Sequence, residues 1–196
     1  MVQIARLCKL ALAHKHMSYS YATLNELKTY LNISVYDDDM LLLRLLEAAT
    51  KTIDSLTQRR FTAFEETRIV TSVHQQYVFL NDDIVQLLEI KDRNDNVIDV
   101  NTIDIPVYPT RYLKRLNAAF PANGVKVKAQ WGFSFAPPHD IVQICIRLAA
   151  YLYRQKDAQV FDVLGQAATG TLTLPAGIPS DVRQMLDNYR VRSVVL

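Results

Sequence analysis

The sequence predicts an α+β fold in which a small antiparallel β-sheet, of about four to six strands, is inserted between helical segments. Apolar residues recur at helical spacing over 37–60 and 138–156. Between residues 64 and 131, β-branched and aromatic residues become frequent, which favours extended structure. Within this region, residues 125–131 alternate between apolar and polar, as in a half-buried strand. The polar run 92–96 lies between two apolar runs and predicts a hairpin turn.

Two shorter helices are indicated by their first residues. Thr23 and Glu26 form a capping box, in which the hydroxyl and the carboxylate satisfy free amides of the first turn, so a helix is expected over 23–31. Ser180 is a favourable N-cap residue ahead of an apolar helical face, which predicts a last helix over 180–190.

The helix predicted over 37–60 carries opposite charges at its two ends. The run Asp37-Asp38-Asp39 suits the positive end of the helix dipole, and Arg59-Arg60 suits the negative end. Three adjacent acids could also hold a divalent cation, but the dipole is the simpler explanation. Asp82-Asp83 is interpreted in the same way, as a turn and not as a metal site.

The composition is that of one domain with a sizeable core, because the chain has 196 residues and 49% of them are hydrophobic. The formal net charge of +2 is mild for a dedicated nucleic-acid-binding protein, although a weak contact with DNA stays open. Cys145 lies in an apolar helical pattern and is expected to be a small buried residue. Two cysteines do not make a disulfide framework, so we expect folding in a reducing cytoplasm.

Three parts of the chain are expected. Residues 1–17 are predicted to form an N-terminal helical arm, because basic residues interrupt the apolar run that a secretory signal needs. Residues 18–190 form the main domain, with its β region over 64–131, and residues 191–196 form an apolar C-terminal tail. No apolar run approaches the roughly 20 residues of a membrane span, so no membrane contact is expected.

The sequence motifs of common enzyme classes are missing. The sequence has no glycine-rich phosphate loop, no dinucleotide-binding motif and no nucleophile elbow. His14, His16, His74 and His139 do not combine with cysteines at the spacing that a metal site needs. We therefore expect a protein that is not an enzyme, with no catalytic residues, no cofactor and no metal ion.

Two groups of basic residues are candidates for contact with DNA: Arg59 and Arg60, and Arg111, Lys114 and Arg115. Ordinary solvated surface is the simpler interpretation. The alternative is a ring of positive charge around a channel, in which each charge is multiplied by the number of subunits. Such contacts would be made to phosphate, so they would be sensitive to salt and indifferent to base sequence.

Five short segments, each degenerate alone, occur in a characteristic order over about residues 19–192. They are Tyr21-Ala22-Thr23-Leu24-Asn25-Glu26-Leu27-Lys28-Thr29-Tyr30-Leu31, the helix from Asp38-Asp39 to Thr57-Gln58-Arg59-Arg60-Phe61, Trp131-Gly132-Phe133, the apolar helix Ile141 to Tyr153, and Ile178-Pro179-Ser180-Asp181-Val182 to Tyr189-Arg190. In this order the chain resembles the tailed-phage head–tail connector (portal adaptor) protein family. The arm before Met17 is an addition to that pattern, and the β region is longer than in short members.

The resemblance implies a mostly helical bundle with an inserted small antiparallel β-sheet. It also implies a homo-oligomeric ring, typically of twelve subunits, that lies under the portal protein in the virion neck and is assembled in the host cytoplasm. Such a ring extends the channel for double-stranded DNA and docks the stopper or tail-completion protein. The segment that would insert into the portal is the tail Val191-Arg192-Ser193-Val194-Val195-Leu196. The residues that would face the channel are Arg59, Arg60, Arg111, Lys114 and Arg115.

Two alternatives to this function remain at the level of sequence. The chain could be another neck or tail-completion protein that caps the adaptor without contacting the portal. It could also be a non-specific nucleic-acid-binding module, which would need a continuous basic face in the monomer.

Overall fold

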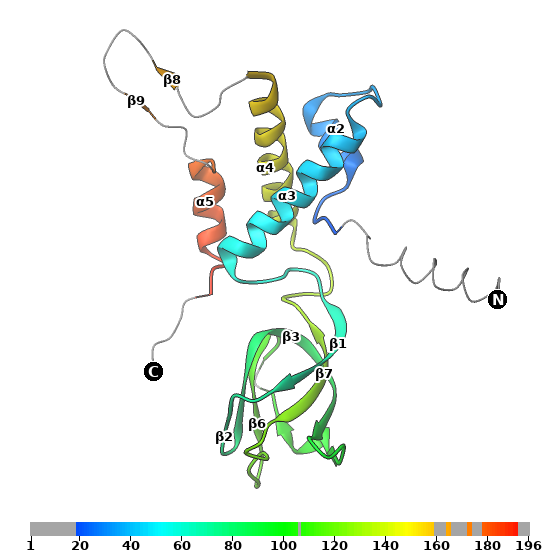
Figure 1. Ribbon diagram of the computed structural model, residues 1–196, viewed down its shortest axis with the longest axis vertical. Coiled ribbons are helices and arrows are strands. Elements are labelled where there is room, and N and C mark those ends of the chain that lie inside the picture. The colour runs from blue at the N-terminus through cyan, green and yellow to red at the C-terminus, as the bar shows by residue number, and fades with distance from the viewer. Residues whose placement is uncertain (1–18, 106, 159–163, 166–171, 174–177, 192–196) are drawn as a thin grey trace, which may run out of the picture. The chain divides into compact units, whose positions relative to one another are not determined.

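The computed structural model describes residues 19–105, 107–158, 164–165, 172–173 and 178–191 (Figure 1). The chain divides into two compact units. The helical unit comprises Met1–Ile53 and Gln143–Arg183, and the sheet unit comprises Asp54–Val142 and Gln184–Leu196. None of the helices within the described ranges is long and apolar enough to cross a membrane.

The first described helix, α2 (Leu24–Leu31), begins as its sequence predicts. The Glu26 amide donates to the Thr23 hydroxyl at 3.2 Å, and the Thr23 amide donates to the Glu26 carboxylate at 2.7 Å, which confirms the capping box. The helix ends at Asn32, whose φ of 57° is left-handed and whose amide donates to the carbonyls of Lys28 and Thr29. Asparagine tolerates this conformation better than most residues, so it serves here as a helix stop.

The three remaining helices are α3 (Asp39–Thr57), α4 (His139–Ala158) and α5 (Ser180–Asp187). The buried aliphatic side chains of the helical unit come from α2, α3 and α4: Leu27, Leu42, Leu46, Ala49, Ile53, Ile144, Leu148 and Ala149. A short pair of strands, β8 (Leu164–Gly165) and β9 (Leu172–Thr173), follows α4. This unit therefore has a core of its own, built mainly from the inner faces of α3 and α4.

Cys145 is buried in that core, as its sequence context predicts. Its thiol lies 3.5 Å from the hydroxyl of Thr50, which in turn accepts the amide of Tyr21 at 3.2 Å. Burial raises the pKa of the Cys145 thiol, which keeps it in the neutral form. The residue therefore behaves as a small apolar group that also satisfies a buried hydroxyl.

The acids before α3 have partners within the protein. Asp38 accepts a hydrogen bond from the Tyr153 hydroxyl at 2.6 Å, and Asp39 forms an ion pair with Lys28 at 2.6 Å. These contacts join the start of α3 to α4 and to α2. They add specific tertiary bonds to the favourable position of the acids at a helix start.

The sheet unit contains a seven-stranded antiparallel sheet in which β3 is central. The strands are β1 (Phe64–Val70), β2 (Val73–His74), β3 (Tyr77–Asp92), β4 (Val97–Ile98), β5 (Ile103–Asp104), β6 (Thr110–Arg115) and β7 (Val125–Trp131). Their order is β1-β7-β3-β6-β5, with β2 and β4 also paired to β3. The turn after Asp92 joins β3 to β4 as the predicted hairpin.

The expectation of a mostly helical bundle with a small inserted sheet is wrong. In the described part of the chain, four helices accompany this seven-stranded sheet, which has its own hydrophobic core. The predicted turn at Asp82-Asp83 is also wrong, because both residues lie inside the sixteen-residue strand β3. The pairing of β3 with β6 shifts register between Phe79 and Ile84, so the acids occupy an irregularity within a continuous strand.

Strand β7 shows the alternation that its sequence predicts, with Val125, Val127, Ala129 and Trp131 buried and the residues between them half-buried. The next residue, Gly132, has a φ of +145°. A Cβ atom there would come within 2.8 Å of the Ala63 Cα. Glycine is therefore required where β7 leaves the sheet beside the chain segment that enters β1.

We expect Leu46→Ala to destabilise the protein by about 2–5 kcal/mol, because Leu46 is fully buried in α3 and its truncation leaves a cavity. Leu45→Ala is the matched control, since the neighbouring leucine is only half-buried. Urea unfolding followed by circular dichroism measures both changes. An equal loss for the two variants would contradict the placement of the α3 core face.

Candidate functional site

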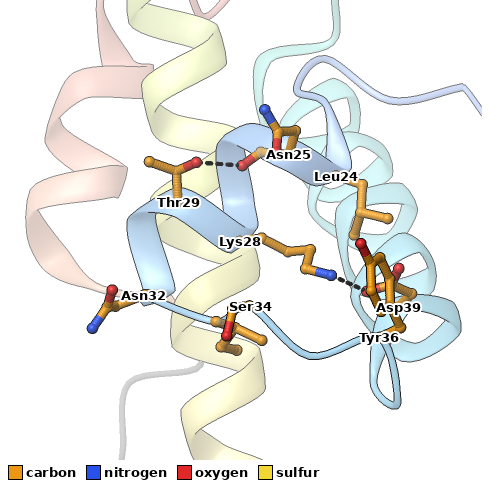
Figure 2. A pocket seen from close by; sticks show the side chains of 9 residues that line it. Leu24, Asn25, Lys28, Thr29, Asn32, Ser34, Tyr36 and Asp39 are labelled. Atoms are coloured by element: carbon orange, nitrogen blue, oxygen red, sulfur yellow. Dashed lines mark hydrogen bonds and ion pairs between the residues drawn. The ribbon is translucent and has the colours of Figure 1, made fainter.

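The helical unit carries an open groove of about 740 Å³ between α2, the turn after it and the start of α3. Figure 2 shows that Lys28 reaches across this groove to Asp39, with the ring of Tyr36 beside them. The Lys28 ammonium lies 4.5 Å from the centre of that ring. Amides and hydroxyls supply the other polar groups: Asn25, Thr29, Asn32 and Ser34. The groove is thus polar but locally neutral, which suits a protein surface better than a phosphate.

A set of exposed apolar side chains lies along the same segment of chain. Tyr36 is 81% exposed and Met40 is 66% exposed, with Val35 and Tyr30 close to half exposed. We call these four residues the α2–α3 rim. Scattered apolar residues are normal on a surface, but four within eleven positions mark a candidate interface.

In the sheet unit, two of the predicted basic residues meet at one buried carboxylate. The Asp83 side chain is only 3% exposed. The Arg59 Nη1 atom lies 2.9 and 3.0 Å from its two oxygens. The Arg111 guanidinium approaches the same oxygens at 3.1 and 3.3 Å. The structure therefore brings Arg59 and Arg111 together around a residue for which the sequence predicts a turn.

Of the other three predicted basic residues, Arg60 lies in the segment before β1, whereas Lys114 and Arg115 lie in β6. The Arg60 guanidinium lies 4.0 Å from the centre of the Phe64 ring. Consecutive residues of a strand point to opposite faces, so Lys114 and Arg115 diverge. Lys114 lies 6.0 Å from the Tyr77 ring, whereas Arg115 donates to the Ala119 carbonyl at 2.9 Å. These residues do not form one continuous basic face.

The C-terminal segment is anchored to the sheet unit through an aromatic cluster. The Tyr189 ring lies 5.3 Å from Phe61 and 5.8 Å from Phe133, in edge-on contacts with both. Its hydroxyl donates to the Asp140 carboxylate at 3.0 Å. Burial and the hydrogen bond to Asp140 both raise the pKa of Tyr189, in that order of size.

Val191 extends this anchor, because its amide donates to the Thr57 carbonyl at the end of α3, at 3.1 Å. Val191 is the first residue of the predicted portal contact, and Arg192 to Leu196 lie outside the described residues. Within the ranges described, no group of three or more histidines, cysteines and carboxylates is placed to hold a metal ion.

The apolar rim, the neutral groove and the anchored C-terminal segment are features of a protein that acts by binding other proteins. Residues 21–192 match the family model for head completion protein (HCP). The chain belongs to the head completion protein family. This result confirms the resemblance described above, and the protein is a head–tail connector protein. No curated protein matches the chain.

Three solved structures share the fold. One, described as the neck of the empty GTA particle computed with C6 symmetry, is 17% identical and has a TM-score of 0.63 over 90% of this chain and 93% of its own. The neck of the native GTA particle computed with C12 symmetry is 17% identical, with a TM-score of 0.61 over 90% and 92% of the two chains. A chain from the virion of the native gene transfer agent (GTA) particle is 18% identical, with a TM-score of 0.52 over 90% and 93%.

The bond between Tyr189 and Asp140 predicts a loss of stability in alkali. Because the folded-state pKa of Tyr189 is raised, the contribution of this bond is complete below the unfolded pKa of about 10 and is lost as pH rises through the folded pKa. Tyr189→Phe should cost about 1 kcal/mol at pH 7 and show a weaker decline above pH 10. Urea unfolding from pH 7 to 11 measures both. Parallel declines in the two proteins would contradict the assignment.

Proposed function

We propose that the protein assembles as a ring of twelve copies beneath the portal, where it extends the DNA channel and receives the stopper or tail-completion protein. The family match over residues 21–192 carries this proposal. The likeness in fold to neck proteins computed with C6 and C12 symmetry supports a closed ring. The role is mechanical: it needs surfaces for neighbours, portal and DNA, and no chemical step.

The α2–α3 rim is the surface that we assign to the neighbouring copy. A closed ring buries a different patch of each subunit against the next one, so an apolar surface that is exposed in the monomer becomes covered. Tyr36 and Met40 would supply most of the apolar area there, since they are its most exposed members. The neutral groove beside them would receive polar side chains of the neighbour.

The C-terminal tail is the segment that we assign to the portal. The described residues before it are held firmly, by the Tyr189 ring cluster and by the bond from the Val191 amide to Thr57. An anchor of this kind fixes where the tail leaves the sheet unit and lowers the entropy that binding would cost. The apolar residues Val194, Val195 and Leu196 would then be buried in the partner.

We restrict the proposed contact with DNA to Lys114 and Arg115. The guanidinium groups of Arg59 and Arg111 are both already hydrogen-bonded to Asp83, so they are less available to a phosphate. Contacts at these two residues would be with the DNA backbone and would weaken with salt.

The mass of the protein in solution, alone and mixed with the portal, tests the proposal. We expect a monomer or small oligomer that becomes a ring on the portal. Removal of residues 192–196 should weaken that association at least tenfold while the free energy of unfolding stays within about 0.5 kcal/mol, because the Val191 anchor is retained. Unchanged association would reject the tail as the portal contact. Full-length protein that ignores the portal would favour a tail-completion protein that caps the adaptor.

The rim makes a separate prediction. Tyr36→Asp and Met40→Asp should prevent the ring from closing on the portal, because each places an unpaired charge in an apolar interface. Stability of the monomer should change by no more than about 0.5 kcal/mol, since both side chains are exposed. Ile69→Asp is the control, because Ile69 is 57% exposed but lies on β1 of the sheet unit. Rings that form normally with both rim variants would show that the neighbour binds elsewhere.

A further inference from the structure

Asp83 is the buried charge of the sheet unit that most needs explanation. It lies inside the central strand β3, at the irregular pairing with β6, and its side chain is only 3% exposed. Burial of an ionised carboxylate is unfavourable unless opposite charge and hydrogen bonds replace the lost water. Here two guanidinium groups supply four hydrogen bonds to its two oxygens. Asp83 is thus the common partner of Arg59 and Arg111.

The two arginines come from different elements, so the carboxylate links those elements. Arg59 follows the last turn of α3, and Arg111 is the second residue of β6. The Arg111 Nη2 atom also donates to the carbonyl of Gln58 at 2.8 Å. Carbonyls at the end of a helix lack partners within the helix, so this bond caps α3 with a side chain from the sheet.

Both chain connections that leave the sheet toward α3 and α4 are tied to the same place. The amide of Gly132, just after β7, donates to the Asp83 carbonyl at 2.8 Å. The Phe133 amide then donates to the Arg60 carbonyl at 2.8 Å, and the Arg59 guanidinium lies 5.2 Å from the Phe133 ring. Residues 58–63 and 132–134 are therefore bonded to each other and to Asp83, through its backbone and its side chain.

This arrangement competes with a role of the two arginines at DNA. The side chains of Arg59 and Arg111 are only 20% and 26% exposed. Contact with a phosphate would draw them away from Asp83 and leave a buried carboxylate uncompensated, which is a costly exchange. A phosphate contact in solvent would also weaken with salt, whereas pairs that are largely buried are screened much less.

We propose that Asp83, Arg59 and Arg111 form a joint that fastens the end of α3 and both connections to the sheet, and that these arginines serve this joint and not DNA. The joint lies within the sheet unit, where it bonds residues 58–63 and 132–134 to strands β3 and β6. It operates within one copy of the chain, so it does not depend on the proposed ring.

Hydrogen exchange of the free full-length protein, read by mass spectrometry, tests the joint. In Asp83→Asn we expect amides of residues 58–63 and 132–134 to exchange at least tenfold faster, while amides of the β1–β7 pairing keep their protection. Arg68→Gln is the matched control, because Arg68 pairs with Asp82 and Glu66 at the same end of the sheet but does not bond to Asp83. Equal acceleration throughout the sheet, or no acceleration at all, would overturn the proposal.

Arg111→Gln keeps the proposal testable if Asp83→Asn does not fold, because Arg59 still balances the carboxylate. It should accelerate exchange in the same two segments, by a smaller factor. Binding to a short duplex DNA at low salt should stay within twofold of the unmodified protein. Weakened DNA binding with unchanged exchange would assign Arg111 to DNA and reject the joint. The proposed ring is tested separately, by the mass of the complex with the portal, so failure of one proposal can be told from failure of the other.

Discussion

The sheet unit depends on one long strand that stays continuous through two acidic residues. Strand β3 pairs with β7 along one side and with β6 along the other, and β2 and β4 pair with it as well. If the chain turned at Asp82-Asp83, as the local sequence suggests, these strands would lose their common partner. The strand continues because Asp83 receives two arginines, while Asp82 accepts the Asp83 amide at 2.9 Å. Compensation of a buried charge thus accompanies the passage of β3 through these two acids.

Features that depend on neighbouring residues could be predicted from the sequence, and those that depend on distant partners could not. The capping box at Thr23, the alternation along β7 and the burial of Cys145 each follow from a few adjacent positions. The path of β3 follows instead from Arg59 and Arg111, which lie 24 and 28 residues away from Asp83 in the chain. A single sequence gives no sign of such a pairing. For this reason the sequence predicts a smaller sheet and a more helical protein than the structure has.

The candidate site shows the same division. The sequence identifies five basic residues as candidates, but it does not show which of them form ion pairs in the fold. They are Arg59, Arg60, Arg111, Lys114 and Arg115. The sequence analysis does not identify the α2–α3 rim. A signal was available, because Val35 and Tyr36 lie between two predicted helices and belong to the helical periodicity of neither. The family could be recognised from the order of several segments along the chain, although each segment is degenerate when taken alone.

The pairing of charges also suits the proposed channel, past whose wall DNA would move. On the outer face of the sheet, Lys128 lies 2.9 Å from Glu65, Lys126 lies 2.6 Å from Asp95, and Lys91 lies 2.8 Å from Glu89. Exposed pairs of this kind add little to stability, but they remove the net field that would hold a polyanion. A formal charge of +2 per chain, repeated around a ring, then gives weak attraction without base preference. Strong uncompensated basic patches would bind the genome tightly and oppose its movement, so near-neutrality is what the proposed channel requires.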